Sequence, residues 1–345
     1  MMKNRTARVF LGAAVLSAAL VLAAVAARAA EHVKLCSVKS FGGGPTMVAI
    51  EKGFFAKQGL DAELVMFDSA QPIAVAVVSG DCDFGAAGLS AAFFNFAIQG
   101  TLKVIAAGTW EHKGFQSVGI LVSNQAYAAG LKSFKDMAGH TVGITQLGTP
   151  LQYYLLQLAA KYHVPEASIR FVPLQSNSVV ASAIAGGQVD LAVQTAAPIA
   201  AVVTKGDGKV LGWTSDELPP RQGEAVFTAT KTANDRPNIV KAYLAGLRAG
   251  DSYMHDAVVG PDGKRHAGAN QPEVVAIIAR NLQQPEDVIR KNLSYFDPQA
   301  RVAPDDLEAL NAWYVEQHMV KTALKANEIV DMRYAIVMPE GARTE

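Results

Sequence analysis

One stretch of this chain occurs twice, and it constrains the fold more than any other feature. Residues 80–90 and residues 187–195 both begin with Gly-x-x-Asp and continue into an apolar run. Each copy follows a predicted strand, a turn ending in proline, a helix, a second strand and a second helix. We therefore predict one α/β unit used twice, which gives two similar α/β lobes around a hinge and a central cleft.

The two units agree in length and in the order of their elements. From Pro45 to Asp83 the chain advances 38 residues, and from Pro150 to Asp190 it advances 40 residues. In the first unit we expect strands at 33–38 and 62–67 and helices at 47–57 and 72–79. In the second unit we expect strands at 141–145 and 169–174 and helices at 150–162 and 178–185.

The remaining segments complete the two lobes. We expect a helix at 91–99, strands at 103–108 and 209–214, and two extended segments, at 117–122 and 225–230, that cross between the lobes. From residue 237 onward the pattern changes to helices, which we expect at 239–253, 271–281, 285–292 and 305–318. The first lobe is then residues 30–122 together with 226–345, with the terminal helices packed on it, and the second lobe is residues 123–225.

The first 29 residues are typical of a secretory signal peptide. Lys3, Arg5 and Arg8 precede an apolar run at 9–27, and Ala-Arg-Ala at 27–29 fits a cleavage site. A membrane anchor is the alternative. Because Cys36 lacks the small preceding residues of a lipid-modified cysteine, we expect a soluble protein exported to the periplasm.

Charge and motif content argue against several classes of function. Residues 1–29 contain four of the 31 basic residues and none of the 31 acidic residues, so the exported part is mildly acidic. It has no stripe of Lys and Arg, which argues against nucleic-acid binding. It also has no His-Glu-x-x-His or paired-cysteine spacing. We expect no metal, no cofactor and no nucleic-acid partner.

The two cysteines leave the question of a disulfide open. In an oxidising compartment Cys36 and Cys82 could pair. However, Cys36 lies inside the first predicted strand and Cys82 just before the third, so parallel strands would hold the two out of register. We therefore favour unpaired cysteines.

Several segments together resemble the type 2 periplasmic substrate-binding fold, and more narrowly the ABC-transporter receptors for nitrate, sulfonates, taurine and thiamine pyrimidine precursors. The matching segments are 45–49, 53–55, 59–61, 80–90, 142–144 with 148–149, and 187–190. The resemblance implies a receptor, expected to be a monomer, that closes around a small molecule and docks on an ABC permease in the inner membrane. At 87–90 this chain has Ala-Gly-Leu-Ser where many relatives have a Gly- and Pro-rich turn, so ligand identity does not carry over.

The candidate ligand contacts lie on loops that follow strands. In open α/β sheets, ligands bind beyond the carboxyl ends of the strands, and two facing lobes enclose a cleft there. The expected ligand contacts are Ser40, Phe41, Pro45, Thr46, Gly88, Leu89, Ser90, Trp110, Gln116, Leu147, Gly148, Thr149, Thr195, Ala196, Trp213 and Glu224.

The composition of these loops favours an organic acid as the ligand. Most of them lack Lys and Arg, so an anionic group would bind to backbone N–H groups, hydroxyls and helix N-termini. A set of aromatic and aliphatic side chains could form an apolar wall, which favours a sulfonate or carboxylate over nitrate. These side chains are Phe41, Trp110, Phe115, Leu147 and Trp213.

Some of these residues have a purely structural alternative. Ser90 and Thr149 can cap helices as well as contact a ligand, and core packing is the alternative for the two tryptophans. Asp83 and Asp190 are expected to fix the turn into a strand, because they lie at the amino ends of their strands.

Three other functions are alternatives to transport. Gly88-Leu89-Ser90 resembles part of the nucleophile elbow of hydrolases, but the second glycine is absent and no histidine is placed by spacing to activate Ser90. A pyrimidine-forming or dehydratase enzyme of the same fold needs Lys, His or acidic groups in the cleft and usually works in the cytoplasm. A ligand-sensing subunit of a signalling system has the same sequence signals as a transport receptor. We expect a binding protein and not an enzyme.

Overall fold

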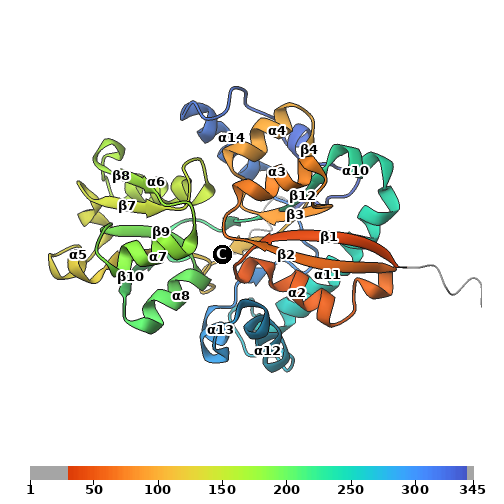
Figure 1. Ribbon diagram of the computed structural model, residues 1–345, viewed down its shortest axis with the longest axis horizontal. Coiled ribbons are helices and arrows are strands. Elements are labelled where there is room, and N and C mark those ends of the chain that lie inside the picture. Colours follow the sequence, from red (N-terminus) through yellow and green to blue (C-terminus); the bar gives the residue numbers. More distant parts are fainter. Residues whose placement is uncertain (1–29, 340–345) are drawn as a thin grey trace, which may run out of the picture.

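A computed structural model describes residues 30–339, which form two α/β lobes side by side (Figure 1). Each lobe is built on a five-stranded sheet covered by helices. The expected signal peptide at 1–29 lies outside the described residues. None of the described helices is long and apolar enough to cross a membrane.

The sheet of the first lobe has the order β2-β1-β3-β12-β4. Its strands are β1 (Glu31–Val38), β2 (Leu60–Phe67), β3 (Phe84–Ala87), β4 (Leu102–Ala107) and β12 (Ala225–Ala229). β1 pairs with β2 and β3 in parallel, and β12 runs antiparallel to β3 and β4.

The sheet of the second lobe has the order β8-β7-β9-β6-β10. Its strands are β6 (Val118–Ser123), β7 (Thr141–Ile144), β8 (Arg170–Pro173), β9 (Leu191–Thr195) and β10 (Gly208–Trp213). Here too the first three strands are parallel, and β6 runs antiparallel to both of its neighbours. The expectation of two similar lobes is confirmed, because the antiparallel strand holds the fourth place in each sheet.

The antiparallel strand of each sheet follows directly after the chain has crossed from the other lobe. We expected residues up to 122 to belong to the first lobe, but β6 lies inside the second sheet. Its six residues are all buried between β9 and β10, so pairing on both sides assigns it to the second lobe. The boundary therefore lies before β6, while the return at β12 falls within one residue of its expected place.

Short helices cover the faces of both sheets. In the first lobe they are α2 (Gly44–Glu51), α3 (Gln71–Ser79) and α4 (Ala91–Ile98). In the second they are α5 (Asn124–Ala128), α6 (Pro150–Lys161), α7 (Asn177–Ala185), α8 (Ala196–Lys205) and α9 (Thr214–Glu217). α2 is shorter than expected, because the chain turns at Gly53 with φ +67° and only a short 3-10 helix follows.

A three-stranded sheet joins the lobes at the hinge. It has the order β11-β5-β13, from β5 (Thr109–Glu111), β11 (Arg221–Gln222) and β13 (Tyr295–Phe296). β5 and β11 belong to the outward and return crossings and pair antiparallel, with Arg221 opposite Glu111. The two crossings therefore support each other.

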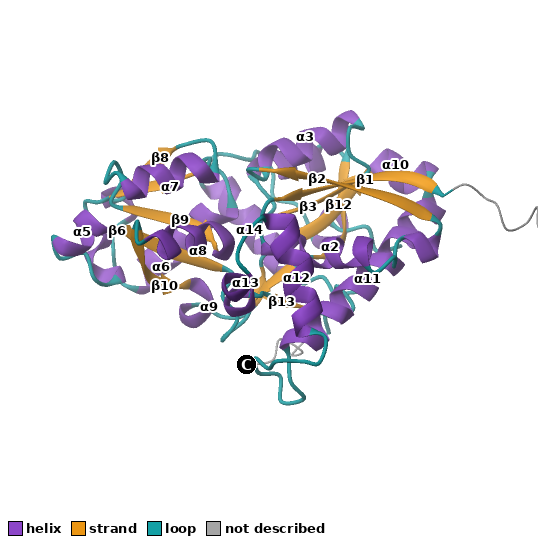
Figure 2. Ribbon diagram, turned by 60° about the horizontal axis from the view of Figure 1, so that its bottom comes forward, coloured by secondary structure: helices purple, strands orange, loops and turns teal. Residues whose placement is uncertain are grey.

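The C-terminal part is helical, as expected. It contains α10 (Thr230–Asp235), α11 (Pro237–Val258), α12 (Gln271–Leu282), α13 (Glu286–Asn292), α14 (Pro304–Glu316) and α15 (Ala326–Ile329). α11 and α12 pack on α2, and α15 packs on α4, all in the first lobe. α13 and α14 lie between the lobes and also contact α8 and α6 of the second lobe (Figure 2).

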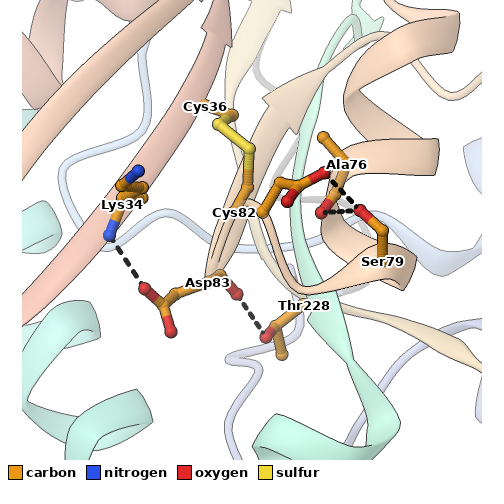
Figure 3. Close-up of a disulfide and its surroundings, with 8 residues drawn as sticks. Lys34, Cys36, Ala76, Ser79, Cys82, Asp83 and Thr228 are labelled. Carbon is orange, nitrogen blue, oxygen red and sulfur yellow. Dashed lines mark hydrogen bonds between the residues drawn. A yellow bond between two sulfur atoms is a disulfide. The ribbon is translucent and has the colours of Figure 1, made fainter.

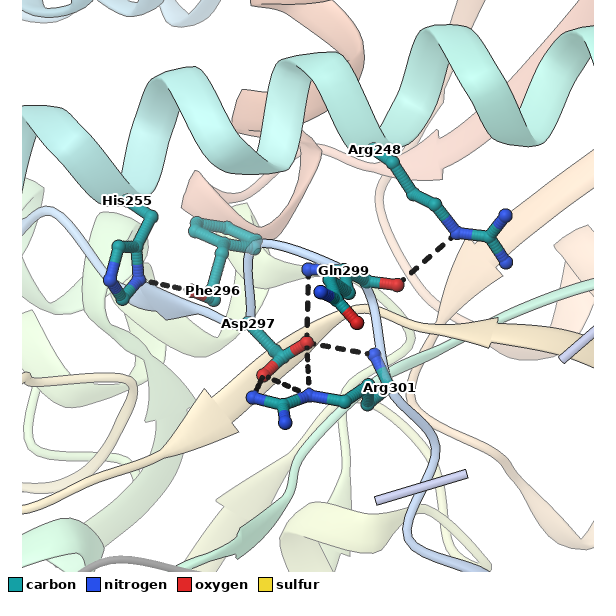
Figure 4. Close-up of polar contacts among 6 residues, drawn as sticks. All are labelled: Arg248, His255, Phe296, Asp297, Gln299 and Arg301. Atoms are coloured by element: carbon teal, nitrogen blue, oxygen red, sulfur yellow. Dashed lines mark hydrogen bonds and ion pairs between the residues drawn. The ribbon is translucent and has the colours of Figure 1, made fainter. Parts of the chain in front are cut away.

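The buried carboxylate of Asp297 fixes the hinge strand β13 to this helical part (Figure 4). Its Oδ1 accepts hydrogen bonds of 3.0 Å from the backbone N–H groups of Gln299 and Arg301, and the Arg301 guanidinium forms an ion pair with both of its oxygens. His255 and Arg248 of α11 hydrogen-bond to the carbonyls of Phe296 and Gln299. These contacts therefore attach the hinge strand β13 to α11 and to the turn that follows Asp297.

The two aspartates of the repeated stretch accept equivalent hydrogen bonds in both lobes. The backbone N–H of Lys34 in β1 donates to Asp83 Oδ2 at 2.8 Å, and the N–H of Thr141 in β7 donates to Asp190 Oδ2 at 2.8 Å. Asp83 also forms an ion pair with Arg236. Its backbone carbonyl accepts a hydrogen bond from the Thr228 hydroxyl (Figure 3). The predicted role of these aspartates in the turn into a strand is confirmed.

The expectation of unpaired cysteines is wrong, because Cys36 and Cys82 form a disulfide with their Cα atoms 6.0 Å apart (Figure 3). Cys36 stands opposite Gly85 in the parallel β1–β3 register, as the strand argument assumed. Cys82, however, is not part of the strand. Its N–H donates to the Ala76 carbonyl at the end of α3, and this bend carries its side chain over β1.

Candidate functional site

A cavity of about 70 Å³ lies between the lobes, at the carboxyl ends of their parallel strands. Both lobes contribute to its wall, Val38 and Gly88 from the ends of β1 and β3, and Thr145 and Thr195 from the ends of β7 and β9. A water occupies about 10–15 Å³ of such space, so the cavity holds a small molecule or a few waters. A second cavity of about 10 Å³ adjoins it along Ser40–Gly42 and Ala196, and we call it the extension because it shares Thr109, Ser117, Thr195 and Glu224 with the first.

Contacts between the lobes enclose this cavity. The N–H of Ala91, at the start of α4, donates to the Gly148 carbonyl of the second lobe at 2.9 Å. The Gln71 side chain donates to the neighbouring Leu147 carbonyl at 2.9 Å. The Gln284 side chain donates to the Ala197 carbonyl at 3.3 Å. The two lobes are therefore in a closed arrangement.

Two carboxylates face the cavity, and one of them, Glu111, is hydrogen-bonded to the protein through one of its two oxygens. Glu111 of β5 is fully buried and accepts a hydrogen bond from the Thr214 hydroxyl. Burial raises the pKa of Glu111, whereas hydrogen bonds from Thr214 and Ser117 and the charge of Arg221 act to lower it. The Glu111 carboxylate thus has donors and a cation close by.

The second carboxylate, Glu224, has no such support. Among the residues that the structure describes, none donates a hydrogen bond to its side chain, which lies in the loop before β12. Burial, and then the negative charge of Glu111, raise the pKa of Glu224 to about 7. Its carboxylate lies against Gly42, where an added Cβ would come within 2.1 Å of Oε2.

Further polar atoms in the cavity wall have no partner within the described part of the chain. They are both side-chain polar atoms of Gln194, which is 1 % exposed, the Thr195 hydroxyl, and Oε1 of Glu111. Buried polar groups are normally hydrogen-bonded, so unpaired ones in a cavity wall indicate that water or a ligand completes them.

Two helices of the second lobe begin at the cavity. Thr149 and Thr195 are the N-cap residues of α6 and α8, and neither side chain caps its helix. The cavity wall includes Thr149–Leu151 and Thr195, with Ala196 in the extension. The first turns of both helices therefore present their partial positive charge on the side of the second lobe.

The structure brings seven of the sixteen predicted contacts together around the cavity and its extension. They are Ser40, Phe41, Gly88, Thr149, Thr195, Ala196 and Glu224. Leu89 lines a separate cavity beside Arg221 and α14 instead. The other eight do not line the central cavity.

For the aromatic residues, the alternative of core packing is the one that the structure adopts. Trp110 is 3 % exposed and belongs to the apolar core of the first lobe. Trp213 packs on Gly119 and Ile199, at the core of the second lobe. Neither tryptophan lines the cavity, so the predicted aromatic wall is reduced to Phe41 in the extension.

The remaining six residues have structural positions. Pro45 and Thr46 are buried in α2, and Ser90 is buried as the N-cap of α4, accepting a hydrogen bond from the N–H of Phe93. Gln116 lies in the crossing loop outside the wall. Gly148 and Leu147 present their carbonyls to the first lobe, and the Leu147 side chain is exposed.

Sequence reasoning named Trp110 as the ligand contact of this segment. The residues that line the cavity are instead its two neighbours, Thr109 and Glu111. Successive residues of a strand point to opposite faces, so a core position for Trp110 directs Thr109 and Glu111 to the other face. The available signal in the sequence was a glutamate between an aromatic residue and a polar loop. Ser117, Thr145, Tyr154 and Asn177 also line the cavity and were missed.

Within the described residues, no group of three or more His, Cys, Asp or Glu side chains is arranged to hold a metal ion. The cavity wall supplies two carboxylates together with hydroxyl and amide groups.

The sequence profile of the NMT1/THI5-like family matches residues 42–257, more than half of the chain. The chain belongs to this family. This result confirms the family resemblance inferred from the repeated stretch and the Gly-rich turns. A protein of Brucella abortus, named as a putative binding protein, is 27 % identical over 62 % of this chain. The match spans 63 % of that relative's length.

Solved structures share the fold at low sequence identity. The alkanesulfonate-binding protein SsuA from Xanthomonas axonopodis pv. citri, bound to MOPS, is 17 % identical with a TM-score of 0.69, over 88 % of this chain and 99 % of that one. The nitrate-binding protein NrtA from Synechocystis PCC 6803 is 18 % identical with a TM-score of 0.58, over 74 % and 68 %. The desulfurization enzyme DSZB is 14 % identical with a TM-score of 0.59, over 89 % and 96 %. The fold is therefore that of periplasmic binding proteins, and one enzyme shares it.

Proposed function

We propose that this protein is a periplasmic solute-binding receptor that captures a small organic molecule between its lobes and delivers it to an ABC importer. The observation that carries this proposal is the enclosed cavity, with unpaired polar atoms of Gln194 and Thr195 in its wall. A site built for a polar ligand leaves such atoms unpaired until the ligand arrives. The similarity to binding proteins of ABC import systems supports the same function.

The proposed ligand carries an acidic group, a sulfonate or a carboxylate. The first turns of α6 and α8 support this choice, because helix N-termini favour negative charge. The cavity volume favours a molecule with few heavy atoms. The Cys36–Cys82 disulfide supports an oxidising compartment such as the periplasm.

The proposed mechanism is hinge closure. A ligand that contacts both lobes favours the closed arrangement, and a permease that recognises the two lobes together would bind the loaded receptor. The protein is proposed to act as a monomer, since each chain contains both walls of its cavity.

An enzyme is the less favoured function, although one structural neighbour is an enzyme. The nucleophile-elbow candidate Ser90 is 1 % exposed, caps α4 and does not line the cavity. The two cavity carboxylates are candidate acid–base groups, but a binding role uses them without a reaction.

Native mass spectrometry of the protein exported to the periplasm tests the proposal. We expect a bound small molecule that is released on denaturation. Adding this molecule back to refolded protein should reduce the radius of gyration in X-ray scattering. Two results together would contradict the proposed function. The exported protein would carry no bound molecule, and its radius of gyration would not decrease with any extract of the medium in which the producing cells grew.

A further inference from the structure

A larger cavity, of about 200 Å³, lies beside the hinge strand β11, and we call it the hinge cavity. α6 of the second lobe supplies Tyr153, Tyr154 and Gln157 to its wall. α14 supplies Leu307 and Leu310, which belong to the apolar core of the first lobe. A water needs about 10–15 Å³ of such space, so the hinge cavity has room for a small organic molecule.

The hinge cavity has a cationic group in its wall, the guanidinium of Arg221, which is 8 % exposed. Its Nη1 donates a hydrogen bond to Oε1 of Gln157, and its central carbon lies 4.9 Å from the centre of the Tyr154 ring. Its Nε and Nη2 have no hydrogen-bond partner within the described part of the chain. Buried donors of a charged group are costly to leave unpaired, so a partner from outside the protein is expected there.

The two unpaired nitrogens lie on one edge of the guanidinium group. The N–H groups of Nε and Nη2 point in the same direction, and a carboxylate can accept one of them with each of its oxygens. The contacts with Gln157 and Tyr154 hold the group from its other side and its face. The free edge is therefore in place before a ligand binds, which reduces the cost of binding.

Acidic residues near Arg221 limit the charge that a ligand can carry. Asp306 and Glu224 also line the hinge cavity, and Asp306 has partners of its own, among them the N–H of Gln222 at 2.8 Å. Glu111 stands opposite Arg221 in the β5–β11 pairing but lines only the central cavity. One guanidinium among these acids favours a ligand with a single negative charge over a multiply charged one such as phosphate.

Much of the remaining wall is apolar, and it reaches the surface. Leu89, Pro220 and Leu310 line the cavity together with Pro219 and Ala309, which are exposed. A ligand can therefore enter from solvent, and an apolar body next to its carboxylate would cover these side chains.

We propose that the hinge cavity is a second ligand site, which binds the carboxylate of a small apolar acid through the Nε–Nη2 edge of Arg221. The two cavities share Tyr154, Gly223 and Glu224 in their walls, but Arg221 lines only the hinge cavity. The site is therefore separate from the proposed solute site. Because its wall comes from both lobes, a bound acid stabilises the closed arrangement.

A matched pair of probes, 4-bromobenzoate and the neutral 4-bromobenzamide, tests this inference. In calorimetry the acid should bind about tenfold or more tightly than the amide, because only the acid accepts two charge-assisted hydrogen bonds from Arg221. In crystals soaked with the acid, the anomalous signal of bromine should lie in the hinge cavity, with the carboxylate at the free edge of Arg221.

Two variants locate the effect at this site. Arg221→Lys keeps the charge but cannot bind a carboxylate with two parallel N–H groups, so it should bind the acid about tenfold more weakly. Ala309→Trp, at an exposed position of α14, fills the cavity and should weaken binding as well. Arg170→Lys, at an exposed position of β8, is the matched control and should bind the acid normally. Circular dichroism would verify that each variant is folded.

Several results would overturn the proposed hinge site. They are equal binding of the acid and the amide, a bromine signal only outside the hinge cavity, and a bromine signal in crystals without binding in solution. Density in which Glu111 or another carboxylate of the protein pairs with the free edge of Arg221 would also overturn it. None of these results affects the proposed solute binding, which native mass spectrometry of the exported protein tests independently.

Discussion

At the scale of single residues, aspartates and glutamates of similar appearance in the sequence have separate functions. Asp83 and Asp190 bind backbone N–H groups at the amino ends of the strands, so they serve the fold. Glu111 and Glu224 lie at the opposite edge, where the cavity is. The edge of the sheet at which a carboxylate lies therefore separates the acids that bind backbone N–H groups from the acids that line the cavity.

The pKa of Glu224 predicts how stability depends on pH. Because its pKa is about 7 in the folded protein and 4.5 ordinarily, the folded state binds more protons than the unfolded state between these values. The contribution of Glu224 to the free energy of unfolding is therefore present below pH 4.5 and is lost as the pH rises through about 7.

Urea denaturation of the ligand-free protein across this pH range measures the effect. The stability of the wild type should fall more steeply with pH than that of Glu224→Gln. The difference between the wild type and Glu224→Gln gives the contribution of Glu224 together with its coupling to Glu111, whose pKa is also raised by burial. Identical slopes would show that Glu224 ionises normally.

At the scale of elements, the first α/β unit contains a covalent link that the pairing of its strands does not predict. The disulfide connects β1 with the bend between α3 and β3, where Cys82 is held by its hydrogen bond to Ala76. The register of β1 and β3 argued against this bond, because register describes the strands and not the bend before them.

Removing the disulfide should lower the stability of the first lobe. The double variant Cys36→Ala/Cys82→Ala opens a loop with a sequence separation of 46 residues. We expect a loss of about 2–4 kcal/mol in the free energy of unfolding, since the cross-link restricts the unfolded chain. Denaturant titration measures the loss, and a reducing agent should destabilise the wild type but not the variant. An unchanged midpoint would contradict the prediction.

At the scale of the whole molecule, the cavity exists only where the two lobes meet, because both contribute to its wall. Gly88 after β3 lies against Pro150 at the start of α6, and an added Cβ would come within 3.1 Å of the proline ring. A side chain at position 88 would therefore press on the second lobe in the closed arrangement, and a branched one would do so more than a methyl group.

A larger side chain at Gly88 should prevent closure without unfolding either lobe. For Gly88→Val we expect no ligand-induced decrease in the radius of gyration and at least tenfold weaker binding, against an unchanged circular dichroism spectrum. Ala129→Val, at an exposed position after α5, is the matched control and should close normally. Normal compaction of Gly88→Val would show that the lobes close by a different contact.

The sequence by itself determined the repeated unit, the longer helices and strands, and the edge of the sheets where the cavity lies. It did not predict the three hinge strands β5, β11 and β13 or the short helices α5, α9, α10 and α15. The predicted elements follow from local patterns, because apolar periodicity and glycine or proline positions act within a few residues. Glu224 and Thr149 could be selected for the same reason, since they lie in loops beyond strand ends.

The tertiary structure decided which sheet β6 joins, how Cys82 reaches Cys36, and which face of β5 the cavity takes. Alternation along a strand places Trp110 and Glu111 on opposite faces of β5. It does not say which face packs on the core and which face lines the cavity. That choice depends on elements distant in the sequence, here β11 and β13, packing around the hinge. The charge of the cavity follows from it, because it places Glu111 beside Glu224.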